Sequence, residues 1–162
     1  DGYDLGIVRY QADYEKYFSD TFRAKGLQYR ELWSFRYLAM MRVDHPAARK
    51  SVVTMGDLSG GIAVGHGDVY VPSLPRETLF APGEAQRSML TYERASQFEL
   101  VATLPQAYAW VSPIPQEMLD RYHLTLRPCA DRPARHKDVL IYRRRYMLSP
   151  MDELFLAQIA RV

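Results

Sequence analysis

The sequence predicts an α/β protein, and two observations point to this class. Short apolar runs of strand length recur along the chain, and most are followed by segments in which apolar residues have helical spacing. This alternation is typical of parallel sheets with helices on both faces. With 48% hydrophobic residues in 162, the chain can bury a proper core, in one domain or in two small lobes.

The first part of the chain predicts a strand followed by a helix. Residues 3–10 contain a short apolar run opened by an acidic residue, which predicts a buried parallel strand. In residues 14–22 the aromatic side chains fall on one helical face and the charges fall elsewhere. Gly26 stands where a left-handed helix cap belongs.

The stretch 35–61 leads from one half of the molecule to the other. Residues 36–43 become increasingly apolar and predict a strand, which Pro46 and the residues before it should end. Thr54 and Asp57 have the spacing of a capping box, so we expect a short helix there that ends at the double glycine 60–61. The next strand, 62–64, ends in Gly65-His66-Gly67-Asp68.

The second half continues the alternation after a proline-containing loop at 69–83. Further strands are expected at 88–92, 107–111, 124–127 and 139–142, with a basic loop at 132–137. Ser96 and Glu99 resemble a capping box that opens a helix through residue 104, and a turn at 112–115 precedes another helix. Ser149-Pro150 should start the last helix.

Composition narrows the function classes. The net charge of +2, from 21 basic and 19 acidic residues, is too balanced for a protein that mainly neutralises phosphates. The single cysteine excludes an internal disulfide and fits a reducing compartment, so we expect a cytoplasmic protein. No apolar run predicts a membrane span. The start, DGYDLG, lacks a methionine and a signal-peptide layout, so we expect the chain to begin inside a larger protein.

Four segments together resemble the effector-sensing domain of LysR-type transcriptional regulators. YDLGIVR resembles the family's l-D-l-g-I strand, and HPAARK followed by D-L resembles its HPLA segment, with Ala47 in place of the usual leucine. ERASQFELVATLPQAYAWVSP and DVLIYRRRYMLSPMDELFLAQI resemble its two later segments, in the same order. The turn at 103–105 lacks the family's usual glycine, and 107–111 is more aromatic than usual.

The resemblance implies a two-lobed, periplasmic-binding-protein-like fold of type 2, with the first lobe incomplete. Residues 1–30 and 128–162 would form a partial first regulatory lobe, and 31–127 would form the second lobe with the crossover strands. The family's helix-turn-helix, linker helix and first strand-helix units are not matched by this chain. DNA would therefore be bound only through a domain absent from it.

Candidate ligand-binding residues follow from the positions of strand ends and helix starts. Ligands of open parallel sheets lie beyond the carboxyl ends of the strands, where helix amino termini offer free amides to anions. This rule selects seven residues as effector-binding candidates: Arg9, Tyr10, His66, Gly67, Asp68, Ser96 and Gln97. By resemblance, those up to Asp68 match positions that line the family's effector cleft. Arg9 would offer a planar fork to a carboxylate, and His66 could donate or titrate.

No catalytic, metal or cofactor site emerges from the motifs. Gly56-Asp57-Leu58-Ser59-Gly60 has its serine one place off a nucleophile elbow, and Gly65-His66-Gly67 lacks the third glycine of a dinucleotide loop. The four histidines lack ligand spacing. The basic clusters 132–137 and 143–145 have no interleaved aromatic residues, which argues against nucleic-acid binding.

The sequence thus predicts a non-enzymatic effector-sensing domain that binds a small, anionic metabolite between two lobes and acts within a homo-oligomer. Two alternatives stay open at this point. One is a stand-alone solute-binding protein of the same fold, and the other is a small enzyme on a similar α/β scaffold.

Overall fold

The computed structural model describes residues 4–67 and 87–159. Asp68, one of the candidate residues, and the loop 69–83 lie outside the described residues. The chain divides into two compact units: unit 1 comprises Asp1–Phe35 and Ala134–Val162, and unit 2 comprises Arg36–Pro133. The assignment of 1–30, 128–162 and 31–127 to regulatory lobes stays a prediction.

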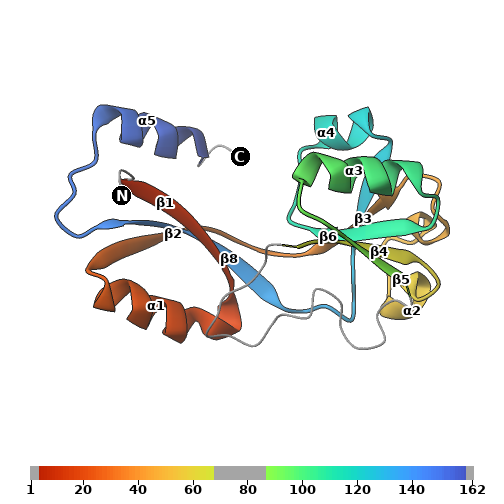
Figure 1. Cartoon of the computed structure of the whole chain (residues 1–162), viewed down its shortest axis with the longest axis horizontal. Coiled ribbons are helices and arrows are strands. Elements are labelled where there is room, and N and C mark those ends of the chain that lie inside the picture. The colour runs from red at the N-terminus through yellow and green to blue at the C-terminus, as the bar shows by residue number, and fades with distance from the viewer. Residues whose placement is uncertain (1–3, 68–86, 160–162) are drawn as a thin grey trace. The chain divides into compact units, whose positions relative to one another are not determined.

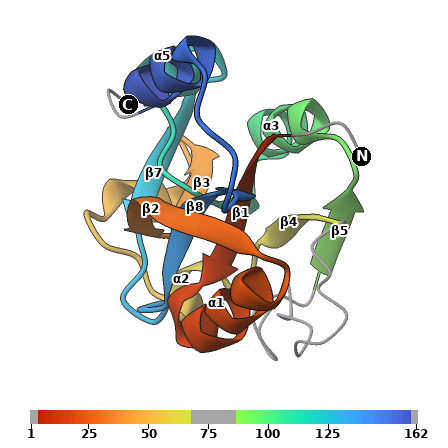
Figure 2. The same ribbon diagram turned by 90° about the vertical axis from the view of Figure 1, so that its left-hand side faces the viewer.

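Unit 1 is built on a three-stranded sheet with a helix on each side (Figures 1 and 2). The strands lie in the order β1-β8-β2, with α1 on one face and α5 on the other. Its elements are β1 (Leu5–Gln11), η1 (Ala12–Tyr14), α1 (Glu15–Ala24), β2 (Leu27–Arg36), β8 (Arg135–Arg143) and α5 (Pro150–Ile159).

Unit 2 is a five-stranded sheet in the order β5-β4-β6-β3-β7. Helices α3 and α4 lie on one face and α2 lies on the other (Figure 1). Its elements are β3 (Leu38–Arg42), η2 (Pro46–Arg49), α2 (Met55–Leu58), β4 (Ile62–His66), β5 (Arg87–Thr91), α3 (Arg94–Thr103), β6 (Ala107–Val111), α4 (Gln116–Arg121) and β7 (Leu124–Pro128). Among the described residues, no helix is both long and apolar enough to cross a membrane.

The expectation of parallel sheets is correct only in part. β4 pairs parallel with β5 and β6, whereas β3 runs antiparallel to β6 and β7. β1, predicted as a buried parallel strand, is antiparallel to β8 and leaves half of Ile7 exposed. An apolar run indicates that a strand is buried, but it does not determine whether the neighbouring strand is parallel or antiparallel.

The helix of unit 1 follows the predicted pattern. Phe18 and Phe22 on α1 are buried, and the ring of Tyr10 on β1 stacks on Phe18 with 4.5 Å between centroids. Gly26 has a φ of +66°, the left-handed conformation that glycine adopts without a steric penalty. The aromatic face of α1 is therefore core, as its spacing indicates.

Strand β2 was not predicted as a strand, and one predicted loop is partly strand. The ten residues of β2 include exposed charges and little regular alternation, because β2 lies at an edge of its sheet. The basic loop expected at 132–137 is wrong from Arg135 onward, where β8 begins. Lys137 fits within β8 because its ammonium group is neutralised by Glu15 at 2.9 Å and Glu31 at 3.0 Å. These pairings raise the pKa of Lys137.

The predicted capping box at Thr54 is confirmed. The hydroxyl of Thr54 accepts a hydrogen bond from the Asp57 amide at 3.3 Å, and the Asp57 carboxylate accepts one from the Thr54 amide at 2.9 Å. Lys50 approaches the same carboxylate at 2.6 Å. The hydrogen bond from Lys50, followed by those from Thr54, lowers the pKa of Asp57 to about 2.

Strand β3 ends where predicted, and His45 organises the turn that follows it. Its Nδ1 accepts a hydrogen bond from the Ala47 amide at 3.1 Å, which caps η2. His45 is buried, and burial lowers its pKa, although the nearby Asp44 opposes this shift. The folded chain therefore favours the neutral imidazole, which is also the form whose Nδ1 can accept the hydrogen bond.

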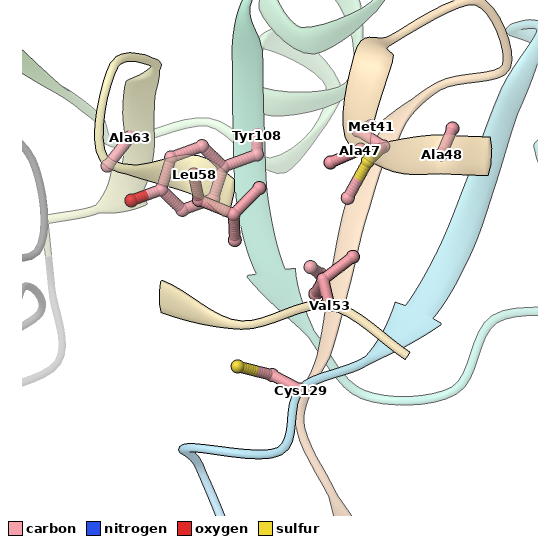
Figure 3. Packing of buried hydrophobic residues seen from close by; sticks show 9 residues of the cluster. Met41, Ala47, Ala48, Val53, Leu58, Ala63, Tyr108 and Cys129 are labelled. Atoms are coloured by element: carbon pink, nitrogen blue, oxygen red, sulfur yellow. The ribbon is translucent and has the colours of Figure 1, made fainter. Parts of the chain in front are cut away.

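One face of the sheet in unit 2 packs against η2 and α2 through a contiguous cluster (Figure 3). Met41 and Tyr108 from β3 and β6 are fully buried there, beside Leu58 of α2 and Val53. Cys129 completes the cluster. Burial is the largest influence on the pKa of its thiol and raises it. This thiol is therefore a packing group, as the sequence indicates.

Met41 provides a test of this core. We expect Met41→Ala to lower the free energy of unfolding by about 2–5 kcal/mol, because the substitution removes buried apolar volume and leaves a cavity. Met147→Ala is the matched control, since Met147 is 87% exposed and Met41 is 0% exposed. Urea unfolding followed by circular dichroism measures both, and equal effects of the two substitutions would contradict the assigned core.

His45 predicts a pH dependence of stability. Its folded pKa lies below the ordinary value of about 6.5, so the unfolded chain takes up the proton first as the pH falls. The contribution of His45 to the free energy of unfolding is complete above about pH 6.5, and it is lost as the pH falls through the folded pKa. His45→Asn keeps a capping oxygen that does not titrate, and it should flatten the decrease in unfolding midpoint between pH 7.5 and 5.5. An unchanged slope would contradict the assignment.

Candidate functional site

The carboxyl ends of β4 and β5 lie side by side in unit 2. The two strands are parallel, with His66 opposite Thr91 in the register. The amide of Gly67 donates to the carbonyl of Thr91 at 2.7 Å, so this pairing extends one residue beyond β4. His66 and Thr91 are both buried. Two predicted site residues, His66 and Gly67, therefore lie at this edge, together with Thr91, which the sequence analysis did not select.

Helix α3 begins at the same edge, with two residues between it and the end of β5. Its N-cap is Glu93, and the predicted capping box at Ser96 is wrong, since Ser96 already lies inside the first turn. The helix can start earlier because Glu93 has an extended backbone (φ −119°, ψ 128°), the conformation that an N-cap requires.

The start of α3 is favourable for an anion. The side chain of Glu93 makes no hydrogen bond to the first turn, which contains Arg94 and no acidic residue. The first amides of an α-helix have no partners within the helix, and they form the positive end of its dipole. This helix end thus offers amide donors, with the opposite charges of Glu93 and Arg94 beside them.

Gln97 fixes α3 to the sheet close to this edge. Its side-chain amide donates to the carbonyl of Val64 on β4 at 3.0 Å, and the residue is only 2% exposed. Its other polar atom, Oε1, is buried and has no hydrogen-bond partner within the described part of the chain. The predicted role of Gln97 as a ligand contact is untested, but its position at the β4–α3 contact is clear.

Packing on the helical face of the sheet holds α3 in this position. Val101 is fully buried in a cluster with Val64 of β4, and Phe98 packs against the same cluster. Because alternate residues of a strand face the same side, His66 lies on the α3 side of β4 as Val64 does. The expected inner face of the helix, which includes Phe98 and Val101, is thereby confirmed.

Arg9 belongs to unit 1 and forms an ion pair within its own sheet. Its Nε and Nη2 both donate to the Asp138 carboxylate at 2.7 Å, across the β1–β8 pairing. The guanidinium also lies over the ring of Phe35, 4.7 Å from its centroid. The planar fork predicted for an effector carboxylate is therefore directed at a carboxylate of the chain itself.

Asp138 is the centre of this cluster. It accepts a third hydrogen bond, from the indole of Trp33 at 2.6 Å. Burial is the largest single influence and would raise the pKa of Asp138, but the hydrogen bonds from Arg9 and Trp33 outweigh it and lower the pKa. The carboxylate is thus charged at neutral pH. The sequence analysis missed this pair because the register of β1 against β8 cannot be deduced from either strand alone.

Tyr10, the other unit 1 candidate, is a core residue. It is buried and stacks on Phe18, and burial, followed by the charge of Glu15, raises its pKa. Its hydroxyl is therefore protonated at neutral pH. Contact of Arg9 or Tyr10 with an effector stays a prediction.

The structure thus brings four of the seven candidates to one edge of unit 2: His66, Gly67, Ser96 and Gln97. Two residues at this edge were missed, Thr91 and the exposed Tyr92 that follows it. Their signal was present, since both end the strand predicted at 88–92. Within residues 4–67 and 87–159, no group of three or more histidine, cysteine, aspartate or glutamate side chains is arranged to hold a metal ion.

Comparison with known proteins identifies the family of the chain. The family model described as the LysR substrate binding domain matches residues 1–162. A search of curated proteins found no significant match.

Solved structures of low sequence identity share the fold. The regulatory domain of MetR, a LysR family regulator from N. meningitidis, is 20% identical with a TM-score of 0.59, and the match covers 98% of this chain and 68% of that one. The effector binding domain of QuiR in complex with shikimate is 15% identical (TM-score 0.62, coverage 98% and 70%). The regulatory domain of CcmR from Synechocystis, in complex with 2-PG, is 15% identical (TM-score 0.57, coverage 99% and 73%).

The two sheets and their helices therefore have the periplasmic-binding-protein-like fold that the family resemblance implies. Because the family model matches the full length of the sequence, the chain belongs to the LysR substrate-binding domain family.

Proposed function

We propose that this chain is the effector-sensing part of a LysR-type transcriptional regulator and that its effector is a small organic anion. Family membership supports the regulatory role, and two structural neighbours hold small molecules, shikimate and 2-PG. Shikimate is a carboxylate, in agreement with an anionic effector. The DNA-binding heads that the effector controls would lie outside this chain.

The observation that carries the proposal is the start of α3. Amide donors, the positive end of a helix dipole and Arg94 meet there, with Glu93 at the N-cap, beside the carboxyl ends of two parallel strands. In open α/β sheets, ligands bind outside this edge. In this proposal His66, Gly67, Ser96 and Gln97 contribute one wall of the site, and Arg9, Tyr10 and Asp68 are further contacts.

The effector would act as a switch and would undergo no chemical change. A ligand shifts an equilibrium between two arrangements of a protein only by binding one of them better. In this scheme residues 1–30 and 128–162 belong to a first regulatory lobe, incomplete in this chain, and 31–127 form the second. The effector would lie between the lobes and favour one arrangement.

The regulator would act in the cytoplasm as a homo-oligomer. Among the described residues, β5 lies at an edge of its sheet, and its Met89 and Leu90 are exposed. This position supports self-association, because an edge strand offers backbone groups to another chain. The alternative function is a stand-alone solute-binding protein of the same fold. The arrangement of unit 2 suits either function, since both need a small-molecule site.

An added carboxylate at the start of α3 tests the anion site. We expect Ala95→Asp to weaken binding of an organic acid about tenfold, because the new charge occupies the positive helix end and repels the ligand. The same substitution should leave the free chain equally stable or slightly more stable, so lost binding cannot be attributed to unfolding. Thermal unfolding against carboxylates and sugar phosphates measures both effects; a ligand at a hundred times its dissociation constant adds about 2.7 kcal/mol.

Gln106→Glu is the matched control for this experiment. It adds the same charge to unit 2 but at the opposite edge of the sheet, where Gln106 precedes β6 and lies within 3.4 Å of Arg87. Its effect on affinity should be small. Equal weakening by both substitutions would indicate a general charge effect and contradict a site at α3.

The genomic reading frame separates the two candidate functions. We expect codons for a helix-turn-helix domain ahead of Asp1, as a transcriptional regulator requires. Sequencing the genomic locus is the measurement. A secretory signal in that place would instead establish the solute-binding alternative.

A further inference from the structure

The chain passes between the two units twice. The first passage lies between Phe35 and Arg36, and the second lies between Pro133 and Ala134. In the first passage a single residue separates β2 from β3, so there is little chain that can bend. The second passage is longer, because residues 129–134 separate β7 from β8. The contacts of these residues therefore determine how freely this connection moves.

The start of the second passage is bound to unit 2. Cys129 is buried in the cluster that packs against η2 and α2, and it pairs with Val53 in an isolated bridge (Figure 3). The amide of Ala130 donates to the carbonyl of Val53 at 2.9 Å. The carboxylate of Asp131 accepts a hydrogen bond from the Met55 amide at 2.7 Å. These contacts hold the first three residues of the passage against unit 2.

Arg132, the next residue, stacks on the ring of Trp110. Its Cζ lies 4.5 Å from the centroid of that ring. The ring packs edge-on against the fully buried Tyr108, with 5.8 Å between the two centroids. The Nε1 of Trp110 is buried and has no hydrogen-bond partner in the part of the chain that the structure describes, so packing positions the ring. Trp110 belongs to the stretch 107–111, which is more aromatic than is usual for the family.

Beyond Arg132 the chain enters unit 1 after two residues. Strand β8 begins at Arg135, whose Nε donates to the hydroxyl of Ser34 on β2 at 3.1 Å. The two residues in between, Pro133 and Ala134, belong to no helix or strand. The stacking of Arg132 on Trp110 is thus the last contact with unit 2 before the connection.

We propose that Arg132 is a positioning residue whose stacking on Trp110 confines bending of the second passage to Pro133 and Ala134. As a device of regulation, this inference rests on the proposed function, in which an effector favours one arrangement of two lobes. Trp110 lies on β6 beside β4, and the carboxyl end of β4 is the edge of the proposed site. Stacking of a cation on an aromatic ring is favourable, so this contact joins the strands of the site to the segment that leads to unit 1.

Hydrogen exchange tests the contact in the chain without an effector. Arg132→Gln removes the planar cation, and the amide of Ala130 should then exchange about threefold faster, as expected for the loss of one cation–π contact. Trp110→Phe keeps an aromatic face and should keep the slow exchange. Arg121→Gln, at an exposed arginine of α4, is the matched control and should leave the exchange unchanged. Exchange is measured by mass spectrometry or by NMR.

Distances between the units test the bending itself. Spin labels on Lys25→Cys in unit 1 and Ser51→Cys in unit 2 report the spread of these distances, since both positions are exposed. Cys129 is buried, which protects its thiol from the label. We expect Arg132→Gln to broaden the distance distribution, because bending would then extend beyond the two connecting residues. The control Arg121→Gln should leave the distribution unchanged.

The outcomes separate this inference from the function on which it rests. Unchanged exchange in Arg132→Gln, or an equal effect of Arg121→Gln, overturns the positioning role. Faster exchange without a broader distance distribution makes Arg132 a packing residue of unit 2 and also overturns it. Neither measurement needs an effector. If no organic anion binds the wild-type chain, the proposed function fails, and the two measurements still decide where the second passage bends.

Discussion

Burial of β3 on both faces of its sheet is the constraint on which unit 2 depends. Three consecutive residues, Ala39, Met40 and Met41, are completely buried, although alternate residues of a strand point to opposite sides. Ala39 and Met41 belong to the cluster beneath η2 and α2, and Met40 belongs to the cluster beneath α3 and α4. A single strand therefore joins two cores, and each core needs the other to keep β3 in register between β6 and β7.

The position of the candidate site follows from this arrangement. β6 pairs with β3 on one side and with β4 on the other, and β4 in turn holds β5. Because β4 and β5 are parallel and in register, their carboxyl ends coincide at one edge. The apolar contacts of Val101 and Phe98, with the hydrogen bond from Gln97 to β4, bring the start of α3 to the same edge. Core packing thus places the amide donors of a helix beside two strand ends.

What could be predicted from the sequence was information local to a few residues. The capping box of Thr54 and Asp57 depends on contacts between residues three apart, and the left-handed Gly26 depends on its own lack of a side chain, so both were correct. The helical spacing of Phe18 and Phe22 indicated the buried face of α1. The clustering of His66, Gly67 and Gln97 could also be predicted, because strand ends and helix starts of α/β sheets lie at one edge.

The failures concern pairings between distant residues. The antiparallel match of β1 with β8 joins residues about 130 positions apart, and it decides that Arg9 meets Asp138. No residue near Arg9 in the sequence indicates that Asp138 is its partner. Strand β2 was missed for a related reason, since its charged residues are tolerated at a sheet edge that only the fold defines. The box at Ser96 failed because Glu93, a less usual N-cap, begins the helix three residues earlier.

The ion pair between Arg9 and Asp138 bears on the anion recognition that we propose for this chain. A guanidinium that already makes a bidentate pair with a partly buried carboxylate, and lies over Phe35, is costly to redirect to a ligand, because Asp138 would lose its compensation. Recognition through the backbone amides of α3 has no such cost, since those donors have no partners within the helix. Amides and a helix dipole bind anions less strongly than a free arginine fork would. In the proposed site, discrimination among anions would then have to come from the shape of the ligand.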